Sequence, residues 1–206
     1  VDAAVLDVLT ATVDALRRAG VTVDDHTGPV GLRESAELFQ RLAQPLLAPA
    51  LGQREFAELT AVAASGAGTP RARWARDVTA PARDWVVANE RRQHLAAAWR
   101  RLFRDYDVLL CPVTPTTAIR HDHTADQDAR RIVVNGAPLP YWDQLRWVQA
   151  ISTVNLPVAT VPVGLSAAGL PVGMQIVGPY LEDRTVIDVA ARLAAAVGGF
   201  RPPPGF

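Results

Sequence analysis

The serine and cysteine side chains are the first candidates for nucleophilic chemistry in this sequence. No serine stands next to another serine, and the chain contains no lysine. Hydrolysis of an amide by a serine needs a residue that takes the hydroxyl proton, and donors directed at the developing oxyanion. We therefore predict no catalytic residue within this chain, whose serines are Ser35, Ser65, Ser152 and Ser166.

Cys111 is the only thiol and the alternative nucleophile. A reactive thiolate needs a nearby base and access to solvent, whereas Cys111 ends the apolar run DVLLC of residues 107–111. We predict that it is a buried, small hydrophobic residue. A single cysteine also excludes an intrachain disulfide, which fits a reducing cytoplasm.

A second kind of chemistry is suggested by His121 and His123, which are followed by Asp126 and Asp128. On an extended segment the two histidines would point the same way, as a chelating pair does. No third cluster completes a ligand set, so we predict a solvated loop, no metal and no cofactor. A metal-dependent hydrolase built on these histidines is the alternative.

Composition excludes several classes of partner. The formal net charge is +0, with 21 basic and 21 acidic residues, so nothing favours a nucleic acid or an anionic membrane. No apolar run approaches the roughly 18–20 residues that a membrane span requires. The length of 206 residues is enough to bury a hydrophobic core.

The first half of the chain has mainly helical periodicity. Apolar residues recur at intervals of three and four, as on the buried face of a helix. Prolines at 45 and 49 should bend or end the second helix. A short strand is predicted at 21–23 and another at 107–111. The predicted helices cover 1–20, 32–51 and 55–64, and a long one follows Pro81.

The second half contains a predicted β-hairpin. Two β-rich runs, 158–163 and 172–177, are joined by the turn Ser166–Gly169. The second run is apolar on both faces apart from Gln175, which is typical of a strand covered on both sides. Residues 141–151 predict a helix, whereas residues 113–140 have little periodicity. Asp183 is predicted to cap a last helix that ends at Gly198.

The hairpin and the segments before it resemble the amidase signature family. The matching words, in the same order as in the family, are DYDVLLCPVTPT, PYWDQLRWVQAIS, LPVATVPVG and GLPVGMQIVGPYLEDRT. The resemblance implies an α/β fold, the C-terminal part of the amidase-signature fold, in which helices cover a mixed β-sheet. Residues 1–105 would be mostly helical and 106–206 sheet-forming, with a weak internal boundary near 65–70.

Members of that family hydrolyse amides with a serine nucleophile, a second serine in a cis peptide and a lysine, all N-terminal to the part that matches here. The resemblance therefore implies that residues 1–206 are the C-terminal portion of an amidase and are inactive alone. The missing N-terminal half and a small amide would be the partners. The family is often dimeric, which leaves a homodimer open. The alternative is a non-catalytic scaffold or binding module derived from the same fold.

The resemblance also implies a substrate wall on the acyl side of the active site. Carried over residue by residue, it consists of Thr114, Pro115, Trp142, Trp147, Ile151 and Ser152. The alternative is that the aromatic group around Trp142 and Trp147, with Tyr141, is ordinary core. Asn155 replaces the small residue of the family's commoner NL-GLP word, which changes the backbone at that point. For Arg184 we expect a role in capping and a local ion pair rather than in holding a carboxylate.

Overall fold

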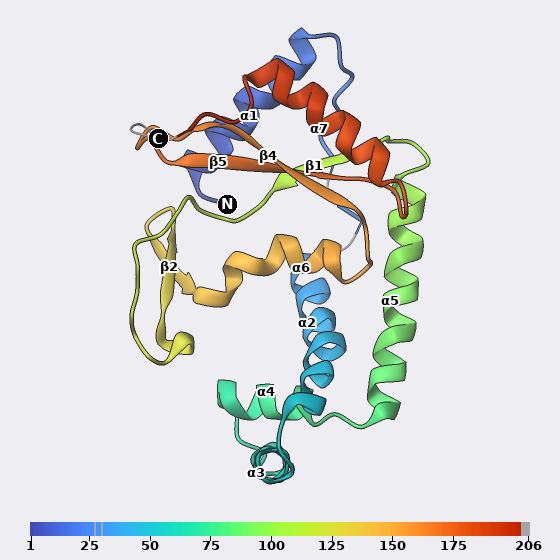
Figure 1. Ribbon diagram of the computed structural model, residues 1–206, viewed down its shortest axis with the longest axis vertical. Helices are drawn as coiled ribbons and strands as arrows, with labels where there is room; N and C mark the ends of the chain where they lie inside the picture. Colours follow the sequence, from blue (N-terminus) through green and yellow to red (C-terminus); the bar gives the residue numbers. More distant parts are fainter. Residues whose placement is uncertain (27, 30, 203–206) are drawn as a thin grey trace.

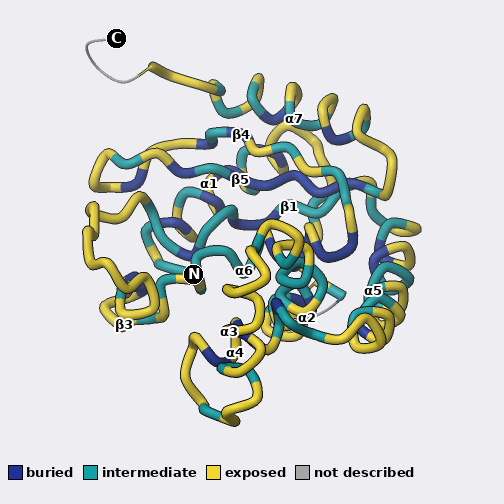
Figure 2. Tube along the Cα trace, turned by 60° about the horizontal axis from the view of Figure 1, so that its bottom comes forward, coloured by how far each residue is buried: buried dark blue, intermediate teal, exposed yellow. Residues whose placement is uncertain are grey.

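A three-stranded antiparallel sheet forms the centre of the protein, whose computed structural model describes residues 1–26, 28–29 and 31–202 (Figure 1). The predicted hairpin is present as β4 (Val158–Leu165) and β5 (Pro171–Val177). The predicted buried strand, β1 (Leu109–Pro112), pairs with the other side of β5, giving the order β1-β5-β4. β5 is therefore the central strand, and most of it is buried (Figure 2).

The two faces of β5 pack on different helices, because successive side chains of a strand point to opposite sides. Met174 and Ile176 face a core shared with α1 (Ala3–Arg18) and α7 (Asp183–Val197). Val177 belongs to a second core, shared with α5 (Ala82–Leu102) and α6 (Arg146–Ser152). Burying one such aliphatic side chain stabilises the fold by roughly 1.5–3 kcal/mol. The expected α/β architecture, with helices over the sheet, is confirmed, whereas the strand pairs among the described residues are all antiparallel and not mixed.

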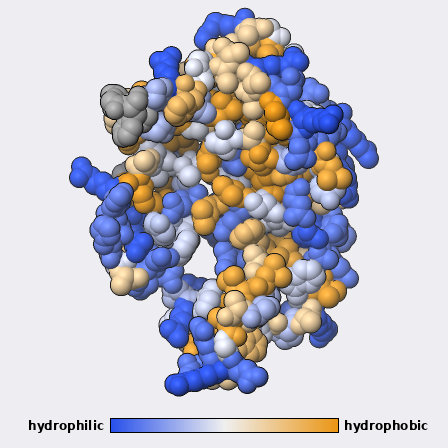
Figure 3. Space-filling view, in the orientation of Figure 1, coloured by the Kyte–Doolittle hydropathy of each residue, from blue (hydrophilic) through white to orange (hydrophobic). Residues whose placement is uncertain are grey.

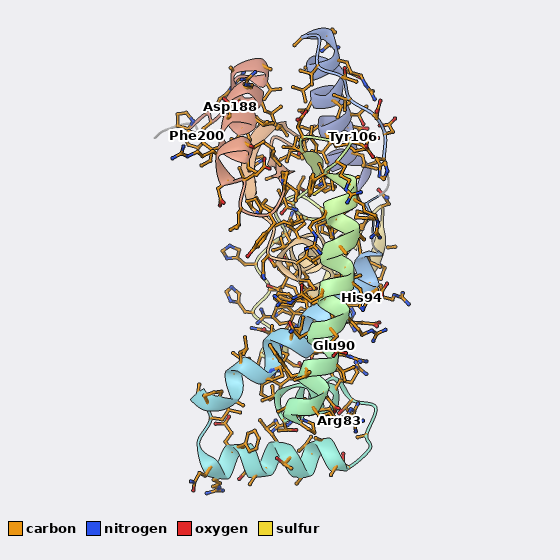
Figure 4. All side chains as sticks on the ribbon, turned by 90° about the vertical axis from the view of Figure 1, so that its right-hand side faces the viewer. Arg83, Glu90, His94, Tyr106, Asp188 and Phe200 are labelled. Atoms are coloured by element: carbon orange, nitrogen blue, oxygen red, sulfur yellow. The ribbon has the colours of Figure 1, made fainter. Side chains whose placement is uncertain are left out.

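The α5 helix extends from the sheet to a helical layer at the opposite end of the molecule; Arg83, Glu90 and His94 mark its length in Figure 4. Leu59, Ala75 and Val78 form the small core of this layer. The stretch 65–70 connects two of its helices, and Thr69 caps the second by accepting a hydrogen bond from the backbone of Ala72 (3.2 Å). The layer consists of α2 (Leu32–Ala43), the 3₁₀ helix η1 (Gln44–Ala50), α3 (Gln53–Ala64) and α4 (Pro70–Val78).

A second hairpin occupies part of the segment 113–140, which showed little periodicity. Its strands are β2 (Arg131–Val134) and β3 (Ala137–Pro140), preceded by η2 (Gln127–Ala129) and followed by η3 (Tyr141–Leu145). Asn135 and Gly136 form its turn with φ of +50° and +78°, the left-handed pair that a tight two-residue hairpin turn requires.

Two local predictions are wrong. Residues 21–23 form no strand: no strand lies beside them among the described residues, and the Arg17 guanidinium instead donates a hydrogen bond to the Val23 carbonyl (3.0 Å). Asp183 does not cap α7, because Glu182 occupies the N-cap position and Asp183 is the first helical residue. The end of α7 at Gly198 is as predicted, with φ of +93°.

Candidate functional site

The six residues predicted to bind substrate lie on two segments of the chain. Thr114 and Pro115 follow β1, while the other four are distributed along η3 and α6. Of the six, Trp142 lines a large cleft. Its side chain is half-exposed, and its indole Nε1 donates a hydrogen bond to Asp128 Oδ1 (3.1 Å).

The cleft has a volume of about 1030 Å³. It is visible as a hollow at the lower left of Figure 3, between the β2–β3 side and the helical layer. α2, α4, η2 and η3 with α6 form its walls. The residues that line the cleft include Glu37, Gln40, Arg41, Trp74, Asp77, Asp126, Asp128, Trp142, Leu145 and Gln149.

Hydrogen bonds between side chains connect the elements of the wall that carries Trp74. Trp74 Nε1 donates to Gln44 Oε1 (3.0 Å), and Gln44 Nε2 donates to Gln40 Oε1 (2.6 Å). The Gln40–Gln44–Trp74 chain therefore links α2, η1 and α4 through side chains alone. It holds the Trp74 ring in one orientation at the edge of the cleft.

Acidic and basic side chains share the cleft. Burial raises the pKa of the Asp77 carboxyl above its usual value, and the neighbouring Arg41 and Arg76 oppose that rise. The guanidinium groups of Arg73 and Arg76 donate to the carbonyls of Gly68 (2.6 Å) and Ala67 (3.1 Å), which ties them to the loop before α4. The cleft can thus hold a ligand by ring contacts and hydrogen bonds; its described lining includes no serine, cysteine, histidine or lysine.

The other predicted substrate residues lie away from this cleft. Ile151 is 3% exposed, and it packs with the partly buried Trp147 in the core beneath β1 and α5. Ser152 is exposed and lines a separate hollow of about 410 Å³ near the start of β4. Thr114 donates a hydrogen bond to the Thr116 carbonyl (2.7 Å), and the carbonyl of the buried Pro115 accepts one from the backbone of Asp2 (2.6 Å). A substrate role for these residues remains a prediction.

The backbone conformation of Asn155, just before β4, is not the extended one that usually leads into a strand. Its φ is +56°, in the left-handed region that asparagine adopts more readily than most residues other than glycine. Asn155 lines the same hollow as Ser152. Asparagine at this position is therefore compatible with the turn that leads into β4.

Cys111 is buried, and this burial raises the pKa of its thiol to about 12. Gln175 lies opposite it in the sheet, where the amide Nε2 lies 3.7 Å from Sγ and donates a hydrogen bond to the Pro112 carbonyl (2.7 Å). A thiol in these surroundings stays protonated at neutral pH. The prediction that Cys111 is buried is confirmed.

The imidazole rings of His121 and His123 lie 6.1 Å apart on an exposed segment. Within residues 1–26, 28–29 and 31–202, no group of three or more histidine, cysteine, aspartate or glutamate side chains is placed to hold a metal ion. Among the described residues, no ion pair includes Arg184. No described helix is long and apolar enough to cross a membrane.

Two sequence comparisons connect this chain to amide chemistry. A family model described as Amidase matches residues 1–187. A glutamyl-tRNA(Gln) amidotransferase subunit from Halothermothrix orenii is 28% identical over 113 residues, which cover 55% of this chain and 21% of that protein. Indoleacetamide hydrolase of Bradyrhizobium diazoefficiens is 33% identical over 117 residues, which cover 55% of this chain and 20% of the relative.

Solved structures match over nearly the whole chain. A crystal structure of an amidase superimposes with a TM-score of 0.73 and 21% identity, covering 96% of this chain and 43% of that one. A bacterial aryl acylamidase of the amidase signature family gives a TM-score of 0.67 and 20% identity, covering 95% and 41%. This chain thus spans about a fifth of the length of the curated relatives and about two-fifths of the solved ones. Because the family model matches most of its length, the chain belongs to the amidase signature family.

Proposed function

We propose that this chain forms the C-terminal region of an amidase that hydrolyses a small, linear carboxylic amide to the acid and ammonia or an amine. The observation that carries the proposal is the cleft beside Trp142, because a residue of the family word PYWDQLRWVQAIS lines a cleft large enough for a small ligand. In this proposal the cleft holds the acyl side of the amide.

The serine nucleophile, the second serine and the lysine would lie in a preceding part of the protein. The absence of lysine from the chain supports this division. The chain also matches only 21% of the length of the first curated relative and 43% of the solved amidase, which supports it as well. Two of the four serines are buried, Ser35 in α2 and Ser166 in the turn after β4, and this also supports the division.

Exposed apolar side chains support a covering partner. Leu46 and Leu47 on η1, and Val86 and Val87 on α5, are each about half exposed or more. Contiguous exposed apolar patches mark interaction sites on soluble proteins. We propose that the missing N-terminal half covers this surface. We also propose a cytoplasmic location, in line with the single reduced cysteine.

The test joins residues 1–206 to the polypeptide encoded in frame upstream of Val1 and measures amide hydrolysis. The joined protein should release acid and ammonia, the isolated chain should not, and Trp142→Ala in the joined protein should lower kcat/KM by about tenfold. Turnover by the isolated chain that disappears in Cys111→Ala would contradict the proposal. An upstream sequence without a lysine and a Gly-Ser-Ser word would favour the scaffold alternative.

A further inference from the structure

A leucine occupies a left-handed backbone position in the turn between β5 and α7. The Glu182 backbone N–H donates a hydrogen bond to the Pro179 carbonyl (3.0 Å), which closes a turn over residues 179–182. Leu181 is the third residue of this turn and has φ of +67°. A turn position with positive φ usually holds glycine or asparagine, because the Cβ atom of other residues is strained there. The turn therefore carries backbone strain at a residue with a large apolar side chain.

The side chains at the tip of this turn are exposed. Leu181 is 75% exposed and Tyr180 is 55% exposed, and neither belongs to a hydrophobic core of the described residues. A single exposed apolar side chain is common on proteins and needs no explanation. An exposed leucine on a strained backbone is different, because such strain is concentrated at sites that bind or switch. We call Tyr180 and Leu181 the docking tip.

Two hollows adjoin the turn that carries the docking tip. Leu181 lines the first, of about 410 Å³, together with Leu156 and Pro157. Pro179 lines the second, of about 510 Å³, together with Phe103 at the end of α5. The docking tip is thus an exposed point beside recessed surface, a shape that a complementary partner can enclose.

Charged side chains follow the docking tip. The Glu182 carboxylate accepts a hydrogen bond from the Thr185 hydroxyl (3.0 Å). Asp183 and Arg184 form no ion pair in the part of the chain that the structure describes. An apolar centre with a polar rim is the usual anatomy of a protein–protein interface. The two carboxylates disfavour an anionic lipid surface, so the docking tip fits a protein partner.

The preceding part of the same protein is the partner that the chain lengths favour. This chain covers 43% of the solved amidase and 41% of the aryl acylamidase, so more than half of each structure lies outside the match. A partner joined by a peptide bond has a high effective concentration, so a small apolar contact is enough to hold it.

We propose that the docking tip inserts into an apolar pocket of that preceding part, and that burial of Leu181 there offsets the strain of its backbone. This inference rests on the proposed function, which places such a part before Val1.

The first test measures the burial of position 181 by thiol labelling. Leu181→Cys is made in the 206-residue chain and in the chain joined to the polypeptide encoded in frame upstream of Val1. Modification by N-ethylmaleimide is followed by mass spectrometry of the peptide that contains position 181, so the buried Cys111 does not interfere. The introduced thiol should react close to the rate of an unfolded cysteine in the isolated chain, and at least about 100-fold more slowly in the joined protein.

Ile187→Cys is the matched control for labelling. Ile187 is 63% exposed but lies on the regular helix α7, outside the strained turn. Its thiol variant should react at similar rates in the isolated chain and in the joined protein. Protection at position 187 equal to that at position 181 would mean that the docking tip has no special contact, and would overturn the inference.

The second test uses Leu181→Gly, whose effect should change sign between the two proteins. In the isolated chain glycine relieves the left-handed backbone, so the melting temperature should stay unchanged or rise by up to about 2–4 °C. In the joined protein the lost leucine side chain leaves its pocket empty, so the melting temperature should fall by at least about 2 °C. Leu181→Met keeps an apolar side chain and should change neither temperature appreciably.

Equal labelling of position 181 in the two proteins, or a rise in both melting temperatures with Leu181→Gly, overturns the inference. Protection in the isolated chain that grows with its concentration would show that a second copy covers the docking tip, and would overturn it as well. Amide hydrolysis by the unmodified joined protein is measured separately. If position 181 is protected but no amide is hydrolysed, the docking contact stands and the proposed function fails. If amides are hydrolysed while position 181 stays reactive, the proposed function stands without this contact.

Discussion

Asp2 and Asn135 lie 133 positions apart in the sequence and bind one another's backbone segments. The Asn135 backbone N–H donates to Asp2 Oδ2 (2.8 Å), and Asn135 Oδ1 accepts from the Ala3 backbone N–H (2.8 Å). Asp2 Oδ1 meanwhile caps α1 by accepting from Ala4 (3.0 Å). One carboxylate thus joins the start of α1 to the tip of the β2–β3 hairpin.

We expect Asp2→Ala to lower the free energy of unfolding by about 1 kcal/mol, the usual cost of losing a helix N-cap. Asn135→Gly keeps the left-handed turn but removes the side chain. The two substitutions remove different hydrogen bonds of the same contact, and each bond holds the two segments in place for the other, so the double variant should lose measurably less than the sum of the single losses. Urea unfolding of the four proteins checks this. Strict additivity would mean that the two hydrogen bonds form independently of one another in solution.

Acid should weaken this contact. The hydrogen bond from the Asn135 backbone, and then that from Ala4, lower the pKa of Asp2 below its ordinary value of 3.8. A carboxyl whose pKa is lower in the folded than in the unfolded protein stabilises the fold at pH values above its unfolded-state pKa. This stabilisation is lost as the pH falls through the folded-state pKa of the carboxyl. Stability measured from pH 5 downward should therefore fall less steeply in Asp2→Asn. An NMR titration of Asp2 that gave an ordinary or raised pKa would contradict this.

Cys111 should be nearly inert in the folded protein. With a pKa of about 12, roughly 10⁻⁴ of the thiol is ionised at pH 8, compared with about a quarter of an unfolded cysteine. Alkylation by iodoacetamide, followed by mass spectrometry, should therefore be at least about 1,000-fold slower without urea than in denaturing urea. Similar rates in the two conditions would show that the thiol is accessible and ionised in the folded state.

Gly178 lets α7 approach the end of β5. A Cβ atom at Gly178 would collide with Val186 Cγ2, and Val186 is buried in the core. Gly178→Ala should cost about 1–3 kcal/mol through overpacking. Adding Val186→Ala should recover part of that loss, because it removes the atom that collides. Gly68→Ala, where the added Cβ meets no atom within 4 Å and φ is not positive, is the control and should change stability by less than about 0.5 kcal/mol.

Substitutions at Asn155 test whether the turn before β4 requires a left-handed backbone conformation. With φ of +56°, Asn155→Gly should leave the melting temperature unchanged or raise it. Asn155→Ala should be about 1 kcal/mol less stable than the glycine variant, because alanine pays the left-handed penalty without a local hydrogen bond. Equal melting temperatures for the two variants would mean that this turn relaxes to another conformation.

Most of the fold could be predicted from periodicity and turn residues. The β4–β5 hairpin, the burial of both faces of β5 and the long α5 helix all follow from local patterns that tertiary packing reinforces. The strand expected at 21–23 fails because β-propensity alone provides no neighbouring strand. α4 was missed although Thr69-Pro70 is a good helix start. The β2–β3 hairpin was missed although Asn135-Gly136 is a strong hairpin signal, since Pro138 and Pro140 weakened the strand pattern.

The candidate site was less predictable. Trp142 could be chosen because it belongs to a family word, but Trp74 lies on the helix that was missed. Gln149 has no special sequence context. What unites these residues is the packing of α2, α4 and α6 around one cleft, which no short sequence pattern encodes.

The order β1-β5-β4 has a consequence for biosynthesis. The central strand is the last of the three to leave the ribosome. β1 and the apolar side of α5 are therefore made well before any strand that can cover them, and β4 gains its partner only when residues up to Val177 have emerged. Among the strands of residues 1–206, β1 and β4 therefore pair only once β5 is available. Until then the nascent chain exposes the surfaces that chaperones recognise.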